Sequence, residues 1–167
     1  MTVICGFDPG LKGAATAILV EEMGGIELID IIDLPTRADG SNRALHIAPL
    51  GRWLENIAPD LAIIENVQPM GGVGAGSVPM MGSAAFRFGM ACGALRGALE
   101  AYEIPVRLVV PTVWKRSHGL LKQGKDASLY KARELLPQAT KFLLRKMDHN
   151  RAESLLLALY GASQINR

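Results

Sequence analysis

Two carboxylates follow apolar stretches of the chain, and a third lies close to its end. The apolar stretch from Val3 to Phe7 leads into Asp8, and the shorter one from Leu61 to Ile64 leads into Glu65. Glu153 lies in a segment that is expected to be helical. Acids that converge without matching bases repel one another, and a bound hard cation relieves that repulsion. The pattern therefore indicates a site for Mg²⁺, with Mn²⁺ as a substitute.

A fourth ligand is expected next to Glu153, and two residues qualify equally. His149 precedes Glu153 by four positions, so the two side chains share a helical face. Asp148 lies one residue further back and carries the carboxylate that such a site prefers. The candidate ligands are therefore Asp8, Glu65 and Glu153, with either Asp148 or His149.

A stretch rich in positive charge suggests what such a site would act on. Residues 107–146 contain ten lysines and arginines but only two acidic residues, Asp126 and Glu134. Such a density of positive charge suits a polyanion. Two divalent ions about 4 Å apart can activate water and stabilise the leaving oxygen in phosphodiester cleavage. The acids and the basic stretch together predict a metal-dependent nuclease.

The elements that must position these residues can be read from hydrophobic patterning. Three strands in a meander, followed by alternating helices and strands, predict an α/β fold with a mixed sheet. Strands are expected at 3–8, 14–20, 26–34, 61–64 and 106–110, and helices at 42–57, 83–102, 126–136 and 149–162, with a polar loop at 35–41. If the first and fourth strands are parallel neighbours, Asp8 and Glu65 emerge at the same edge of the sheet.

Composition places the chain among globular proteins. Its 167 residues are 49% hydrophobic and 20% charged, with a net charge of +2, so we expect a single domain over 1–167. No apolar run approaches the ~20 residues of a membrane helix, and the first residues do not resemble a secretory signal. Cys5 and Cys92 lie in apolar contexts and are expected to be buried free thiols, which suits the cytoplasm.

One predicted helix carries an unusual row of glycines. Gly89, Gly93 and Gly97 recur at a spacing of four within residues 83–102. Each glycine costs a helix on the order of 1 kcal/mol relative to alanine, so another backbone is expected to approach this face. The neighbour is either the protein's own sheet or the same helix of a second copy.

The order of these features resembles the RuvC family of Holliday-junction resolvases. The matching segments are Gly6–Gly10, Ile63–Glu65, Val109–Lys115 and Arg151–Ala158, and the likeness spans nearly the whole chain. It is strongest for phage-type members, because of the run 148–153. The resemblance implies a ribonuclease-H-like five-stranded mixed sheet flanked by helices. It also implies a homodimer and cleavage of four-way DNA junctions by two divalent metals per site.

The resemblance also implies which residues meet DNA. The family places a lysine near the scissile phosphate, and Lys115, Lys122 and Lys125 all remain candidates here. The other basic residues expected to contact DNA are Lys12, Arg116, Arg145 and Lys146. The family uses the loop after Glu65 to probe the junction, often with an aromatic residue. None occurs between Asn66 and Gly82, so Met70, Val73, Met80 and Met81 are the apolar candidates.

Three other interpretations fit parts of the pattern. The first is a nuclease of the same fold that acts on RNA or on other branched DNA. The second is a nucleotide-binding module, because Asp8–Gly13 also looks like the phosphate loop of actin-like ATPases; those need a second similar half, which we do not expect in 167 residues. The third is an inactive DNA-binding module, which would have no reason to keep three mutually repelling acids.

Overall fold

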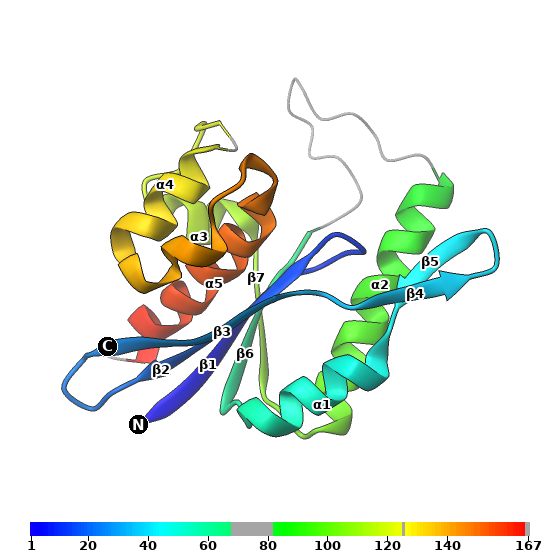
Figure 1. Cartoon of the computed structure of the whole chain (residues 1–167), viewed down its shortest axis with the longest axis horizontal. Coiled ribbons are helices and arrows are strands. Elements are labelled where there is room, and N and C mark those ends of the chain that lie inside the picture. Colours follow the sequence, from blue (N-terminus) through cyan, green and yellow to red (C-terminus); the bar gives the residue numbers. More distant parts are fainter. Residues whose placement is uncertain (68–81, 125, 166–167) are drawn as a thin grey trace.

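A five-stranded mixed sheet forms the centre of the computed structural model, which describes residues 1–67, 82–124 and 126–165. The strand order is β3-β2-β1-β6-β7, with β1 antiparallel to β2, β2 antiparallel to β3, and β1, β6 and β7 mutually parallel (Figure 1). These strands are β1 (Thr2–Asp8), β2 (Ala14–Val20), β3 (Ile26–Asp33), β6 (Leu61–Glu65) and β7 (Val106–Val109). The predicted five-stranded mixed sheet is confirmed.

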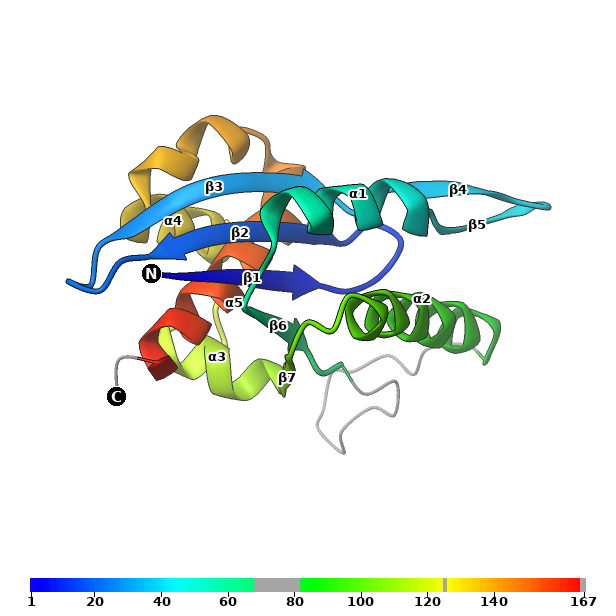
Figure 2. The ribbon, with the colours of Figure 1, turned by 90° about the horizontal axis from the view of Figure 1, so that it is seen from below.

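Helices cover both faces of this sheet. One face carries α3 (Pro111–Ser117), α4 (Asp126–Leu135) and α5 (His149–Ile165), and the other carries α1 (Ile47–Ile57) and α2 (Gly82–Ala101) (Figures 1 and 2). Two short 3₁₀ turns, Pro137–Phe142 and Lys146–Asp148, connect α4 to α5. Within the described ranges, no helix is both long and apolar enough to cross a membrane.

Strand β1 is apolar on both sides because it lies in the middle of the sheet. Ile4 packs into the cluster beneath α5, whereas Cys5 and Phe7 pack into the cluster beneath α1 and α2. This alternation follows the period of two of a strand. Both thiols are free; Cys5 is fully buried, and Cys92 on α2 is only half-buried.

A close contact between the backbones of the sheet and a helix lies at Gly6. A Cβ atom at this position would overlap the backbone carbonyl oxygen of Ser154 and the backbone nitrogen of Ala158. Glycine therefore allows α5 to lie directly on β1, with backbone against backbone. Beside this contact, the hydroxyls of Thr16 and Ser154 form a buried 2.6 Å hydrogen bond between β2 and α5.

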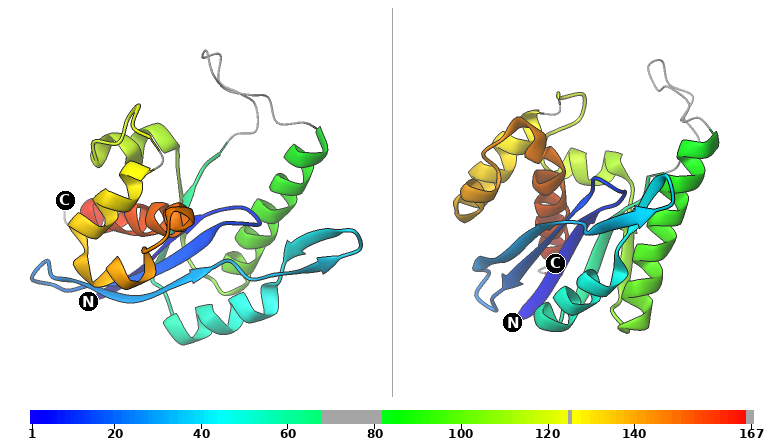
Figure 3. Two further views of the ribbon diagram at one scale, coloured as in Figure 1. Left: turned by 45° about the horizontal axis from the view of Figure 1, so that its top comes forward. Right: turned by 45° about the vertical axis from the view of Figure 1, so that its right-hand side comes forward.

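The predictions for residues 35–57 were partly wrong. Residues 42–57 are not one helix, because β5 (Asn42–Leu45) pairs with β4 (Thr36–Asp39) in a hairpin and α1 begins only at Ile47. The expected polar loop is therefore largely a strand. Gly40 has a φ of +58°, which suits the tight turn between the two strands. Figure 3 shows this hairpin, in cyan, extending beyond the main sheet beside α2 in green.

One of the two alternatives for the glycine row on α2 was that it packs against the protein's own sheet, and this alternative is wrong. Gly89, Gly93 and Gly97 are exposed, and no described atom lies within 4 Å of a Cβ built at any of them. The core-facing positions of α2 are instead Ala91, Leu95 and the pair 98–99. The alternative of a contact with a second copy stays a prediction.

A pair of glycine substitutions tests the contact between β1 and α5. We expect Gly6→Ala to lower the free energy of unfolding by at least roughly 2 kcal/mol, because the added methyl overlaps helix backbone that cannot move aside. Urea denaturation monitored by circular dichroism measures this loss. The matched substitution Gly124→Ala, in open space at an exposed position before α4, should be nearly neutral. Equal midpoints for the two variants would contradict the assigned contact.

Candidate metal centre

Three carboxylates from distant parts of the chain converge at one edge of the sheet. Asp8 ends β1, Glu65 ends β6 and Glu153 lies in the second turn of α5. Each offers an oxygen atom within 4.8 Å of the others, so a single cation could contact all three. Glu65 is only 8% exposed, and the other two are partly buried. The structure thus brings together the three acids singled out in the sequence.

Strand register explains why the first two acids meet. β1 and β6 are parallel neighbours, and Phe7 pairs with Ile64, so the next residue of each strand is an acid at the same edge. Glu153 joins them because α5 packs on β1 at Gly6. The start of α5 is also tied to β3, since the guanidinium of Arg151 donates two 2.6 Å hydrogen bonds to the carboxylate of Asp33.

The convergence of the acids is electrostatically costly. Burial, followed by repulsion from Glu153 and Glu65, raises the pKa of Asp8 to about 8. The pKa of Glu65 is also raised, first by burial and then by Glu153. Lys115 opposes both shifts. Carboxyl groups with raised pKa values in a cluster of this kind are typical of functional sites rather than of a structural core.

Lys115 is the basic residue that the structure places at the acids. Its Nζ lies 3.4 Å from Oε1 of Glu153 and 5.0 Å from the centroid of the Trp114 ring. α3 begins with Pro111 at its first turn, which directs the chain from β7 back toward the site. Of the three lysine candidates, Lys122 lies on an exposed turn, and Lys125 falls outside the described residues.

Two residues that support the acids were missed in the sequence. The indole Nε1 of Trp114, which is fully buried, donates a 3.0 Å hydrogen bond to Oε1 of Glu65. Ser128 Oγ on α4 donates to Oε1 of Glu153 at 3.3 Å. Such partners orient ligand carboxylates and tune their affinity. Only the position of Trp114 directly before Lys115 could have signalled its role.

Asp148 is not part of the carboxylate cluster. Its side chain is 3% exposed and accepts hydrogen bonds from the Arg145 backbone nitrogen at 2.7 Å and from Nε and Nη2 of Arg145 at 3.0 and 2.7 Å. Although burial acts to raise it, the pKa of Asp148 is lowered overall by these bonds to Arg145. As a metal ligand Asp148 is therefore not supported, because its oxygens already cap the turn that leads into α5.

His149 also lies apart from the three acids, whereas Asn150 lies near Asp8. His149 is not among the residues of the carboxylate cluster, and it lines a shallow cavity with Asp126 and Lys146 instead. Asn150 lines the same cavity as Asp8, and its Nδ2 donates a 2.5 Å hydrogen bond to the Lys12 carbonyl. The sequence interpretation passed over Asn150 because it carries no charge.

The remaining predicted DNA contacts are scattered in the structure. Lys12 lines the cavity of Asp8, and Arg116 is exposed on α3. Arg145 is engaged with Asp148, and the Nζ of Lys146 lies 3.3 Å from Oδ2 of Asp126. The predicted apolar contacts Met70, Val73, Met80 and Met81 lie outside the described residues.

The chemistry of the donor set fits a hard divalent cation. All three groups supply carboxylate oxygens, and within the described part of the chain no cysteine or histidine joins the cluster. Oxygen-only ligands at a partly solvated edge suit Mg²⁺ or Mn²⁺ rather than a softer metal. The raised pKa values have the same implication, since a bound cation would offset the repulsion that causes them.

The fold resembles solved structures, although no protein-family model and no curated protein matches the sequence. RuvC of Thermus thermophilus, solved in complex with a Holliday junction substrate, superposes with a TM-score of 0.68 at 17% identity, covering 98% of this chain and 95% of that one. This chain has the RuvC fold. The fowlpox virus Holliday junction resolvase gives 0.59 at 17% identity over 98% and 99% of the two chains. The yeast mitochondrial Holliday junction resolvase gives 0.59 at 16% over 98% and 80%.

The RuvC fold accounts for almost the whole chain, so the expected ribonuclease-H-like architecture is confirmed. Within this fold, the carboxylate cluster lies where β1, β6 and α5 meet, and none of the three acids comes from the β4–β5 hairpin.

The electrostatic cost of the cluster predicts an unusual dependence of stability on pH. The folded state holds a proton on Asp8 up to about pH 8, whereas the unfolded chain releases it near pH 4. The folded state therefore binds more protons between these values, so the free energy of unfolding should fall by several kcal/mol as pH rises from about 5 to 8 in chelator. Urea titrations at several pH values measure this slope.

Asp8→Asn should flatten that slope and raise stability at pH 8, whereas Asp60→Asn, at the opposite end of β1, should leave it unchanged. Addition of Mg²⁺ should restore wild-type stability at pH 8. Parallel pH profiles for wild type and Asp8→Asn would contradict the assigned repulsion.

The hydrogen bond from Trp114 to Glu65 predicts an optical signal for metal binding. In a Trp53→Phe variant, where Trp114 is the only indole, Mn²⁺ should quench the fluorescence with a saturable dependence on concentration, because the cation binds beside the ring. In the matched Trp114→Phe variant, the remaining Trp53, which donates to Asp30, should not respond. Calorimetry should show about ten-fold weaker Mn²⁺ binding for Trp114→Phe. Unchanged affinity would contradict the supporting role.

Proposed function

We propose that this protein is a structure-selective endodeoxyribonuclease that resolves four-way DNA junctions by metal-dependent hydrolysis of phosphodiester bonds. The observation that carries the proposal is the cluster of Asp8, Glu65 and Glu153, with Lys115 beside it, in a RuvC fold. Structures of Thermus thermophilus RuvC and of the fowlpox virus resolvase with Holliday junctions support DNA junctions as the substrate.

The three carboxylates would hold the divalent cation, which we propose to be Mg²⁺, with Mn²⁺ as a substitute and two ions per site. When bound, such cations activate water and stabilise the charge that develops on the leaving oxygen. The indole of Trp114 keeps Glu65 oriented toward the cluster, and Ser128 does the same for Glu153. Both ligands are thus held in place before substrate arrives.

The protein's own contribution to the reaction centres on Lys115. The ammonium group lies 3.4 Å from Glu153 at the rim of the cluster, so it can neutralise charge on a phosphate placed there. Water attacks the phosphorus, the bond from phosphorus to the 3′ oxygen breaks, and the products carry a 5′-phosphate and a 3′-hydroxyl. The Trp114 ring beneath Lys115 limits where that ammonium can lie.

We further propose a homodimer that uses the exposed glycine face of α2. Gly89, Gly93 and Gly97 leave the helix backbone accessible along one side, which suits close approach by the same helix of a second copy. A pair of sites related by two-fold symmetry matches a junction, where two strands of like polarity must be cut.

Cleavage of a synthetic junction tests the proposed function. Wild-type protein with Mg²⁺ should make paired nicks in a mobile four-way junction and leave a linear duplex of the same arms intact. Asp8→Asn should lower the cleavage rate by at least about a thousand-fold while keeping junction affinity within a few-fold, because it removes a metal ligand and not a DNA contact. The control Asp60→Asn should cleave at the wild-type rate.

The substrate panel also includes a flap, an RNA–DNA hybrid and duplex RNA. Faster cleavage of any of these than of the junction would replace the proposed substrate. Near wild-type cleavage by Asp8→Asn would overturn the assignment of the carboxylates.

A further inference from the structure

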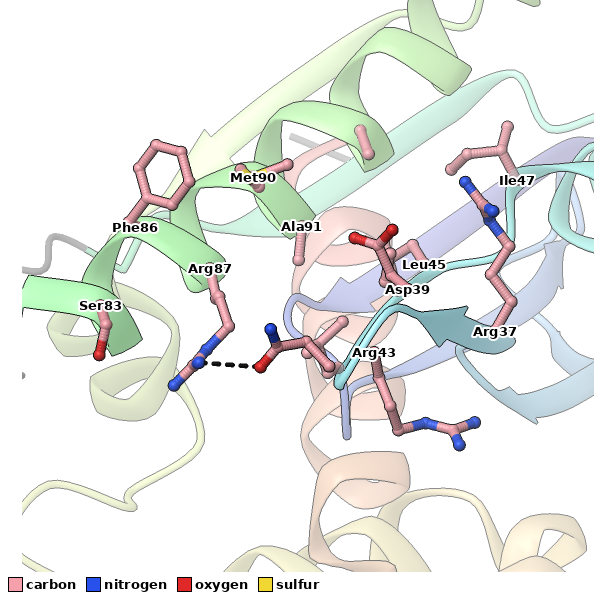
Figure 4. Close-up of a pocket in the computed structure, with 14 residues that line it drawn as sticks. Arg37, Asp39, Arg43, Leu45, Ile47, Ser83, Phe86, Arg87, Met90 and Ala91 are labelled. Carbon is pink, nitrogen blue, oxygen red and sulfur yellow. Dashed lines mark hydrogen bonds between the residues drawn. The ribbon is translucent and has the colours of Figure 1, made fainter.

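A groove separate from the carboxylate cluster lies between the β4–β5 hairpin and α2. Its volume is about 510 Å³, and its walls come from residues 37–47 on one side and 83–94 on the other, with Leu11 at its base. Figure 4 shows Arg87 reaching from α2 toward the hairpin, where its Nη1 donates a 3.1 Å hydrogen bond to Oδ1 of Asn42. The two walls are thus joined by a polar contact.

The charge of this groove is mainly positive. Arg37 and Arg43 on the hairpin and Arg87 on α2 line it, against a single acid, Asp39. Arg43 is held in place by bonds from Nε and Nη2 to Oγ1 of Thr36. The α2 wall contains the first turn of the helix, which carries no acidic residue and whose dipole favours an anion. Phosphate groups suit such a surface.

The groove adjoins the cavity that contains Asp8. Leu11 and Arg87 line both, and the second cavity also includes Lys12 and Asn150. Cationic side chains therefore lead from the carboxylate cluster past Lys12 and Arg87 to the hairpin, where Arg37 and Arg43 project from its two opposite faces (Figure 4). A linear polyanion bound at the cluster would follow this path, because each step offers a positive group to the next phosphate.

We propose that this groove binds the phosphodiester backbone of a DNA arm whose scissile phosphate lies at the carboxylate cluster. The inference rests on the proposed function and assigns the partner of a surface that is distinct from the basic stretch at 107–146. The hairpin arginines contact phosphates on either side of the hairpin and set the path of the arm. These contacts carry no base sequence information.

Salt-dependent binding tests the groove. The probe is a fluorescein-labelled four-way junction, titrated in chelator at several salt concentrations and followed by anisotropy. The Arg37→Gln/Arg43→Gln variant should bind roughly ten-fold more weakly near physiological salt, and the slope of log affinity against log salt should decrease by about 1 to 2, as expected for the loss of one or two phosphate contacts. Arg52→Gln, which removes one positive charge from an exposed position outside both the groove and the basic stretch at 107–146, should keep the wild-type slope.

A double lysine variant distinguishes an effect of lost charge from an effect of altered hairpin structure. Arg37→Lys/Arg43→Lys keeps the charge and should recover most of the slope. If the lysine variant binds as poorly as the glutamine variant, the loss comes from the hairpin structure, and the proposal is overturned. If the slope of the glutamine variant is unchanged while the wild-type protein still binds and cleaves the junction, the groove does not bind the DNA arm, but the proposed function stands. Wild-type protein that binds no junction overturns the proposed function itself.

Discussion

Direct backbone contact between β1 and α5 at Gly6 determines where the third carboxylate lies. Asp8 and Glu65 meet because neighbouring parallel strands end at the same edge, but Glu153 joins them only because α5 crosses β1 without an intervening side chain. A larger residue at position 6 would lift α5 from the sheet and separate Glu153 from the other acids. The metal centre therefore depends on a position that carries no functional group.

The surrounding core maintains this arrangement against electrostatic repulsion. Apolar residues of α5 pack on Ile4 and Ile63 beneath the helix, and the buried pair Thr16–Ser154 and the ion pair Arg151–Asp33 fix its position along β2 and β3. Several such contacts are needed, because the raised pKa of Asp8 shows that the acids oppose one another. Packing in the core thus offsets the destabilising repulsion between the acids, and a bound cation would reduce that repulsion.

A second support comes from α3, whose two central residues act on different acids. Trp114 reaches inward to Glu65 and is fully buried, while Lys115 reaches outward to Glu153 and remains partly exposed. Adjacent residues of a helix point about 100° apart, so one short helix can hold a ligand and place a cation at the same time. His118 anchors this helix to α5 through a 2.8 Å hydrogen bond with the Leu156 carbonyl.

The sequence by itself determined the main sheet and the three acids, because strand periodicity and a carboxylate at a strand end are local features. It could not determine the β4–β5 hairpin, because the two strands are mostly polar and Leu45 continues the apolar spacing of α1. Nor could it determine the open surroundings of the glycines in α2, which depend on what packs nearby. Nor could it choose the ligand before Glu153. Only the tertiary structure showed that neither candidate joins the carboxylate cluster, because Asp148 bonds to Arg145 and His149 lines another cavity. It also brought Trp114, which is 49 residues from Glu65, into contact with that carboxylate. Strands and strand-end acids follow from local sequence patterns, whereas the side chains that contact those acids are determined by how distant segments pack.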